Sequence, residues 1–234
     1  MRVRVATTVL GITAAFLAVP ACSTDSTDTT DTKPGTAASA RSGKPADAAQ
    51  QAAPLTSAAL ETRLLDQSDL GSGYLRKPER PTQHDDVTVI GCQALSELGG
   101  DAATGGTLTF THKAKATFTY GGSSSEISEE LYSDSAEKLS DGIGRIFDAM
   151  TGCPTYQVVA GGTPIDMASQ KLLTPHGLGD EQWSQLLTFS TGGRSTVVKQ
   201  TAIRDGSLLL IVSGSPALVD HHLDKALTKA TAAS

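Results

Sequence analysis

Two adjacent carboxylates are the residues of this 234-residue chain best suited to acid and base chemistry. Asp180 and Glu181 stand side by side in the segment HGLGDEQW, and paired carboxylates can serve as general acid and general base. The chain contains no H-E-x-x-H, no G-x-S-x-G, no P-loop and no G-x-G-x-x-G after a strand. The sequence therefore predicts a protein that is not an enzyme. A hydrolase stays open only if carboxylates, or a serine and a histidine, meet in a cleft.

Histidines and single aromatic residues are the next candidates. His221 and His222 are neighbours in a predicted helix and point about 100° apart, so they cannot hold one metal ion as an i, i+4 pair would. Helix packing or surface exposure is the commoner role of such a pair. We take His112, Tyr120 and Trp183 as candidate ligand-binding residues. The alternatives are a half-buried structural histidine and a tryptophan that fills the core. No metal site and no cofactor is predicted.

The first cysteine follows an apolar run behind a basic N-terminus. Residues 5–19 make a run of 15, whereas a membrane-spanning helix needs about 20 apolar residues. Basic residues before the run and Ala21 after it complete the pattern of a secretory signal peptide, residues 1–21. Cys22 directly after Ala21 resembles the bacterial lipobox, in which the thiol receives a diacylglycerol. Simple cleavage that leaves a free Cys22 is the alternative.

The other two cysteines are the only remaining pair. Three cysteines leave one unpaired thiol in an oxidising compartment, and lipidation of Cys22 removes that oddity. Cys92 and Cys153 are then expected to form a disulfide outside the cytoplasm. Such a bond is worth roughly 4 kcal/mol in the chain-entropy model. Metal binding is the competing use, but no further His or Cys stands at finger-like spacing from either residue.

The chain divides by composition into an anchor, a tether and a domain. Residues 23–54 contain no Val, Ile, Leu, Met, Phe, Tyr or Trp, so with Cys22 they form a predicted disordered tether with a span of about 30 Å. Residues 55–234 are the length of one domain and carry 14 Lys and Arg against 21 Asp and Glu. That acidic balance argues against nucleic acid as a partner and against contact with anionic lipid. Contact with the membrane is expected through the lipid alone.

Hydrophobic periodicity predicts strands joined by hairpins. Residues 107–120 alternate apolar and polar side chains over fourteen positions, and a return strand follows the glycines at 121 and 122. Further strands are expected at 156–159, from 165 onward, at 183–189 and at 195–204. The apolar run 208–212 predicts a buried central strand.

Helices are expected at both ends of the domain and in its middle. Residues 57–67 and a short stretch opened by Cys92 predict helices, and a third begins at Asp134, where Glu137 would complete a capping box. A final helix has Ser215 as its N-cap and Pro216 at its first position. The fold class is therefore α+β, with a mostly antiparallel twisted sheet packed with helices, one disulfide and a single domain.

A string of short motifs resembles a known family. In chain order the motifs are LTSAALETRLLDQSDLGSGY, GCQAL, KATFTYGG, MTGCPTY, HGLGDEQW and TAIRDGSLLLIV. Together they resemble the PknH-type extracellular sensor domain, the outer module of some actinobacterial receptor kinases and of stand-alone lipoproteins. The resemblance implies an extracytoplasmic α+β domain with a cleft, a disulfide between Cys92 and Cys153, and a turn into a strand at Asp180. The kinase sensor has more than one disulfide, whereas this chain offers one pair.

These observations predict a lipid-anchored, non-catalytic sensor-like domain on the outer face of a bacterial plasma membrane. Its expected partners are the membrane, through the lipid, and either a small ligand or an envelope protein. One rival is an envelope interaction or structural lipoprotein that binds no small ligand. A second rival is a lipid carrier, which needs a large apolar cavity between sheet and helices.

Overall fold

Alternating apolar and polar residues build a sheet that has nine strands in the described part of the chain, and every neighbouring pair is antiparallel. The computed structural model describes residues 53–79, 87–99, 109–122, 125–173 and 177–232. The strands are β1 (Tyr74–Arg76), β2 (Val87–Ile90), β3 (His112–Tyr120), β4 (Glu126–Ser133), β5 (Thr155–Ala160), β6 (Thr163–Lys171), β7 (Glu181–Thr191), β8 (Arg194–Asp205) and β9 (Leu208–Gly214). The helices of the described residues are α1 (Ser57–Glu61), α2 (Gln67–Leu70), α3 (Gln93–Leu98), α5 (Ala136–Gly152) and α6 (Pro216–Thr231). This arrangement confirms the predicted α+β class.

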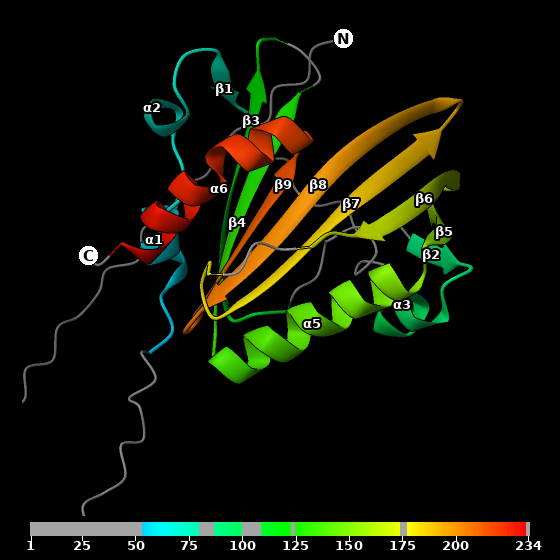
Figure 1. The fold of residues 1–234 in the computed structure, drawn as a ribbon, viewed down its shortest axis with the longest axis horizontal. Coiled ribbons are helices and arrows are strands. Elements are labelled where there is room, and N and C mark those ends of the chain that lie inside the picture. The colour runs from blue at the N-terminus through cyan, green and yellow to red at the C-terminus, as the bar shows by residue number, and fades with distance from the viewer. Residues whose placement is uncertain (1–52, 80–86, 100–108, 123–124, 174–176, 233–234) are drawn as a thin grey trace, which may run out of the picture. The chain divides into compact units, whose positions relative to one another are not determined.

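The strands cross the sheet in an order that differs from their order in the chain. Their order is β1-β3-β4-β9-β8-β7-β6-β5-β2. The last strand, β9, is inserted beside β4, so that Leu210 pairs with Leu131 (Figure 1). Two halves result: β1, β3, β4 and β9 form one, and β8, β7, β6, β5 and β2 form the other.

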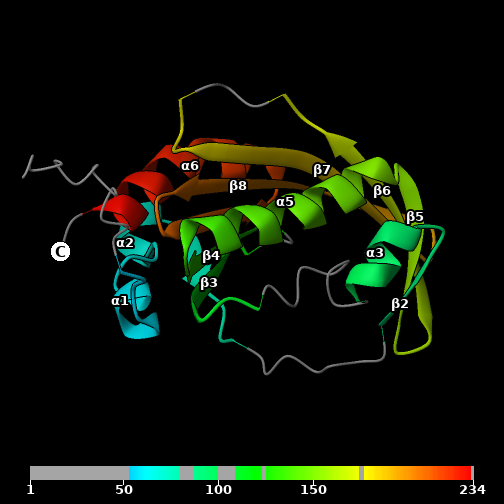
Figure 2. The same ribbon diagram turned by 90° about the horizontal axis from the view of Figure 1, so that it is seen from below.

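Helices on both sides explain why β9 is buried on both of its faces. Leu208, Leu210 and Val212 pack toward α1 and α6, on the side that we call the α6 face of the sheet. Leu209 and Ile211 pack toward α5, on the opposite side, the α5 face. Figure 2 shows α6 and α5 on opposite sides of β7 and β8. The prediction of a buried central strand at 208–212 is confirmed.

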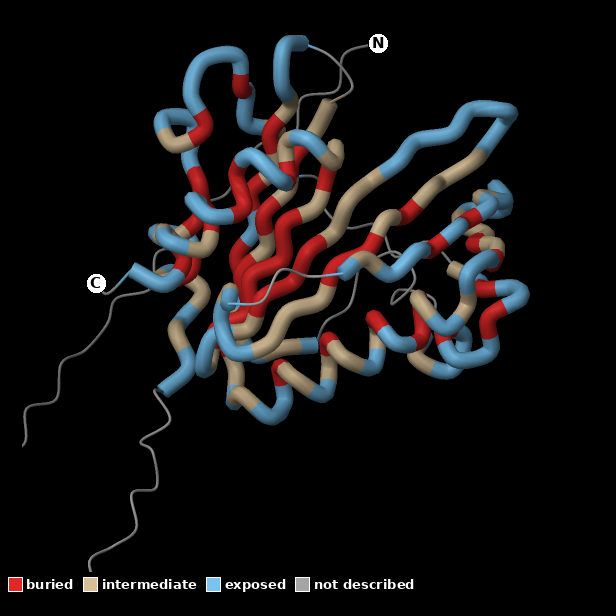
Figure 3. The backbone as a smooth tube through the Cα atoms, in the orientation of Figure 1, coloured by how far each residue is buried: buried red, intermediate tan, exposed pale blue. Residues whose placement is uncertain are grey.

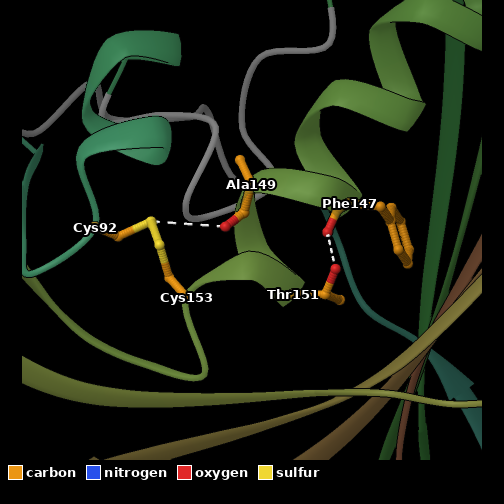
Figure 4. The surroundings of a disulfide bond; sticks show 5 residues. All are labelled: Cys92, Phe147, Ala149, Thr151 and Cys153. Atoms are coloured by element: carbon orange, nitrogen blue, oxygen red, sulfur yellow. Dashed lines mark hydrogen bonds between the residues drawn. A yellow bond between two sulfur atoms is a disulfide. The ribbon is translucent and has the colours of Figure 1, made fainter.

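A disulfide fixes α3 to the end of α5. Cys92 is the N-cap of α3 and Cys153 the C-cap of α5, and their sulfurs are bonded (Figure 4). The Sγ of Cys92 lies 3.6 Å from the carbonyl oxygen of Ala149, a contact only, because a disulfide sulfur has no hydrogen to donate. The hydroxyl of Thr151 donates to the carbonyl of Phe147 at 2.7 Å in the same helix turn. The predicted pairing of the two cysteines is confirmed.

The first predicted helix is wrong in its extent. Instead of one helix over residues 57–67, the chain forms α1, a turn and then α2. The side chain of Asp66 accepts hydrogen bonds from the backbone N–H groups of Ser68 and Asp69, and that of Asp69 accepts from the N–H of Asp66. This reciprocal capping box starts a new helix at Gln67. Asp66, as its N-cap, has an extended backbone and interrupts the predicted helix.

Two other boundaries also differ from those predicted. The N-cap of α5 is Ser135, whose side chain accepts from the N–H of Lys138, and not Asp134. The carboxylate of Asp134 instead accepts hydrogen bonds from the N–H and hydroxyl of Thr111, just before β3. The long strand begins at His112 rather than 107, and residues 107 and 108 lie outside the described residues.

The N-terminal predictions cannot be followed in the structure. The signal peptide, Cys22 and the tether up to residue 52 lie outside the described residues. Within the described ranges, no helix is long and apolar enough to cross a membrane.

Candidate functional site

One half of the α6 face is open. Met167 and Ser169 of β6 point toward the α5 face, so Asp166 and Ala168, which alternate with them along the strand, point the other way. Helix α6 packs on β4, β8 and β9. Asp166 and Ala168 are exposed, and Figure 3 shows the exposed residues along β6 and toward the turn between β7 and β8. In the part of the chain that the structure describes, the sheet is therefore exposed along β6 beside α6.

This open face contains a hollow of about 420 Å³. Its lining residues come from three adjacent strands: Thr155, Tyr156, Gln157, Asp166, Met167, Ala168, Thr188 and Ser190. The amide of Gln157 donates to Asp166 across β5 and β6 at 2.9 Å. The hydroxyls of Ser190 and Ser195 lie 2.8 Å apart across β7 and β8. Hydroxyl and amide groups with one carboxylate suit a small polar ligand that offers both donors and acceptors.

The strands below the hollow are held by a buried polar network on the α5 face. The fully buried Gln185 of β7 accepts a hydrogen bond from the hydroxyl of Ser169 of β6 at 3.0 Å. Its amide nitrogen donates to Gln200 of β8 at 2.9 Å. These side chains fix the register of three strands, because a slip of one residue would leave them buried without partners.

An apolar cluster supports the same strands nearer the disulfide. Residues from β2, α3, α5, β5, β6 and β7 form it: Val89, Cys92, Leu95, Ala149, Met150, Tyr156, Val158, Met167 and Leu187. The strands that form the hollow are thus packed on their other face against this cluster, which includes the disulfide between Cys92 and Cys153.

The three predicted ligand-binding residues do not come together. His112 and Tyr120 lie at the two ends of β3, about 25 Å apart by strand geometry, on the α6 face. Tyr120 packs on Tyr74 with ring centroids 4.7 Å apart. Trp183 lies on the α5 face, partly buried, with its ring centroid 6.5 Å from that of Phe147. None of the three lines the hollow, which lies beside β6 and not beside the long strand.

The paired carboxylates are tied to one arginine. Arg204 donates from Nε to Glu181 at 2.6 Å and from Nη1 to Asp180 at 2.9 Å. Asp180 also accepts the backbone N–H of Gly206, and that bond, with the charge of Arg204, lowers the pKa of Asp180. The hydrogen bond from Arg204, followed by that from Ser140, lowers the pKa of Glu181. Both groups are therefore ionised, which does not suit a general acid.

The two neighbouring histidines have different surroundings. His222 is buried, and its Nε2 lies 2.6 Å from the hydroxyl of Tyr74. Burial, followed by the nearby charges of His221 and Lys225, lowers the pKa of His222. His221 is exposed. Among the described residues, no group of three or more His, Cys, Asp or Glu side chains could hold a metal ion.

One buried acid was missed by sequence reasoning. Glu129 is 1% exposed, between Ile127 and Leu131 on the α6 face of β4. The available signal was its position in the alternation, since Glu129 occupies the apolar phase of the strand. The sequence pattern cannot distinguish a buried acid from an exposed acid at the edge of a sheet. The burial of Glu129 depends on residues 55–73, which pack over this part of β4.

Solved structures identify the fold. The extracellular domain of PknH from Mycobacterium tuberculosis matches 76% of this chain and 97% of its own length, with a TM-score of 0.56 and 15% identity. This chain has the fold of the PknH extracellular domain. A putative uncharacterised protein of Mycobacterium smegmatis, an Rv0999 ortholog, is less similar, with a TM-score of 0.39, 9% identity, and coverage of 70% and 93%. No family model matches the chain, and no curated protein sequence does.

The PknH-like fold confirms the resemblance read from the sequence motifs. GCQAL places Cys92 at the start of α3, and MTGCPTY places Cys153 at the end of α5. HGLGDEQW leads into β7 and contains the carboxylates that bind Arg204. The PknH-like motifs thus position the sheet and its disulfide, whereas the open face is built by alternate residues between them.

Proposed function

We propose that the chain is a lipid-anchored, extracytoplasmic ligand-binding domain of the sensor type, without catalytic activity of its own. The observation that carries the proposal is the match to nearly the whole PknH extracellular domain, 97% of its length. The part of the fold that would bind is the open face with its hollow. The sequence supports placement on the outer face of a bacterial plasma membrane, through the lipobox-like Cys22 and the tether that follows it.

The open shape of the hollow favours a small ligand with some polar groups over a lipid. Its side chains offer hydroxyls, one amide and the carboxylate of Asp166, and it opens on the surface of the sheet. A lipid carrier would bury an acyl chain between sheet and helix. In the described residues those spaces hold the side chains of the three core clusters.

Native mass spectrometry tests the binding part of the proposal. Full-length protein would be released from its own membranes in mild detergent and its mass measured without denaturation. A small polar molecule that co-purifies at one copy per chain is the expected result. Repeated absence of any adduct would contradict it and favour an envelope interaction lipoprotein, and an apolar adduct would favour a lipid carrier.

A further inference from the structure

A buried carboxyl group holds the N-terminal segment (residues 55–73) on the sheet. Oε2 of Glu129 accepts a hydrogen bond of 2.6 Å from the backbone N–H of Leu65. Oε1 of Glu129 is also buried and has no hydrogen-bond partner among the described residues. Both oxygens are thus removed from water, and only one is satisfied. Burial of an ionised carboxylate in that position costs more free energy than burial of the neutral acid.

The surroundings of Glu129 are apolar on the sheet side. Its neighbours on β4 are Ile127 and Leu131, and its partners across the sheet are Ala116 of β3 and Val212 of β9. All four are at most 1% exposed. On the other side lies the N-terminal segment, whose buried leucines are Leu60, Leu64, Leu65 and Leu70. Release of this segment would therefore expose Glu129 to water.

Charged groups stand at the rim of the contact. Lys229 of α6 forms ion pairs with Asp66, at 3.0 Å, and with Asp69. Lys225 of α6 lies 3.9 Å from Asp69, and Arg63 donates to the backbone carbonyl of Ala230 at 2.9 Å. The facing residues Ala116 and Val212 carry no charge. These contacts fasten the segment to α6.

We propose that Glu129 is a proton-binding site that couples protonation of this carboxyl to the docking of the N-terminal segment. The protonated acid is accommodated beneath the docked segment, and the ionised carboxylate drives the segment off so that water can reach it. The segment joins the domain to residues 1–52, so its release would lengthen the connection to the proposed anchor and expose four leucines.

The direction of the pH dependence follows from the group's environment. Burial raises the pKa of Glu129 to about 7 from its ordinary 4.5, although the Leu65 hydrogen bond and the charge of Lys229 oppose the rise and Asp69 adds to it. With the segment released, the exposed carboxyl returns to its ordinary pKa. The docked state therefore loses stability as the pH rises from about 4.5 through about 7. The lowered pKa of the buried His222 has the opposite effect, because it makes the docked state lose stability as the pH falls below about 6.5.

Hydrogen exchange of the full-length chain between pH 5.5 and 8 tests the coupling. After correction for the intrinsic rate, we expect protection of residues 55–73 to fall by about tenfold or more in the wild type. In Glu129→Gln, which keeps an acceptor for the Leu65 N–H but cannot ionise, protection should no longer fall as the pH rises. Glu126→Gln, a charge removal at a partly exposed pair with Lys77, is the matched control and should behave as wild type.

Two results would overturn the proposal. One is a wild-type segment whose protection does not change across this range; the other is a Glu129→Gln protein with an unchanged pH response. His222 titrates in both proteins and cancels from their comparison. If the variant does not fold, the carbon-13 shift of the Glu129 carboxyl in the wild type decides, because a midpoint near 4.5 excludes a proton-binding site at neutral pH.

Discussion

At the residue scale, single buried polar contacts connect segments that are distant in the chain. The hydrogen bond between Tyr74 of β1 and His222 of α6 joins residues 148 positions apart. The rings of Tyr74 and His222 also meet edge to face, with centroids 5.1 Å apart. Because both residues are buried, neither has water as a substitute partner.

Removal of the Tyr74 hydroxyl therefore tests the worth of this contact. Tyr74→Phe leaves His222 Nε2 buried without its partner, and we expect a loss of about 1–3 kcal/mol in the free energy of unfolding, measured in urea. His221→Gln, at the exposed neighbour, should change that free energy by less than about 0.5 kcal/mol. Equal effects of the two substitutions would show that the hydrogen bond contributes nothing.

Sequence reasoning at this scale succeeded where a residue type alone sets the chemistry. The cysteine count predicted the pair Cys92 and Cys153, which the structure contains. It could not predict that Tyr74 would meet His222, or that Arg204 would bind both carboxylates of the HGLGDEQW segment. Those contacts depend on which strands become neighbours.

At the element scale, close approach of backbones limits which residues can end β9. A Cβ on Gly214 would lie 2.1 Å from the carbonyl oxygen of Glu126, and its φ of 149° is rarely adopted by other residues. Gly144 in α5 is the opposite case, since nothing lies within 4 Å of its Cβ position.

The two glycines make a matched pair of substitutions. Gly214→Ala should destabilise the protein by at least about 2 kcal/mol, because β4 and β9 must separate locally. Gly144→Ala should stabilise it by about 0.5–1 kcal/mol through the lower conformational entropy of the unfolded chain. Thermal unfolding of both variants checks this. A stable Gly214→Ala protein would contradict the strand pairing at this point.

Element types were predictable from periodicity, whereas several boundaries were not. The strand ending at Tyr120, helix α5 and the N-cap and Pro of α6 follow from local patterns. The break between α1 and α2 has a local cause, the capping box of Asp66 and Asp69, that the apolar spacing concealed. At the start of α5, two adjacent residues could cap, and the bond from Thr111 to Asp134 decided between them.

At the scale of the whole molecule, the sheet order places the open face. The insertion of β9 between β4 and β8 brings α6 over one half of the sheet, and in the described residues the α6 side of β6 stays exposed. Local sequence does not contain this information, because hairpins fix neighbours only within each pair. The candidate residues His112 and Tyr120 lie on the other half of the sheet from this hollow.

The disulfide is expected to stabilise the half that contains the hollow. Cys92→Ala with Cys153→Ala should lower the free energy of unfolding by up to about 4 kcal/mol. Hydrogen exchange should show the loss in β2, α3 and β5 before β4 and β9. Uniform loss of protection across all strands would show that the two halves unfold as one unit.

The proposed anchor depends on one residue outside the described fold. Cys22→Ser should move the protein from the membrane fraction to the secreted or periplasmic fraction, because the thiol is the expected site of lipid attachment. The unfolding free energy of the domain should not change. A variant that stays with the membrane would contradict the lipobox interpretation.

Binding at the open face is the central claim, and a blocked hollow tests it most directly. Ala168→Trp places an indole on an exposed strand position inside the hollow, and Thr196→Trp does the same at an exposed position on the opposite side of the sheet. The proteins would be released from their own membranes and compared with wild type by native mass spectrometry. We predict that Ala168→Trp loses the co-purifying ligand and that Thr196→Trp keeps it. Equal ligand occupancy in both variants would contradict the account.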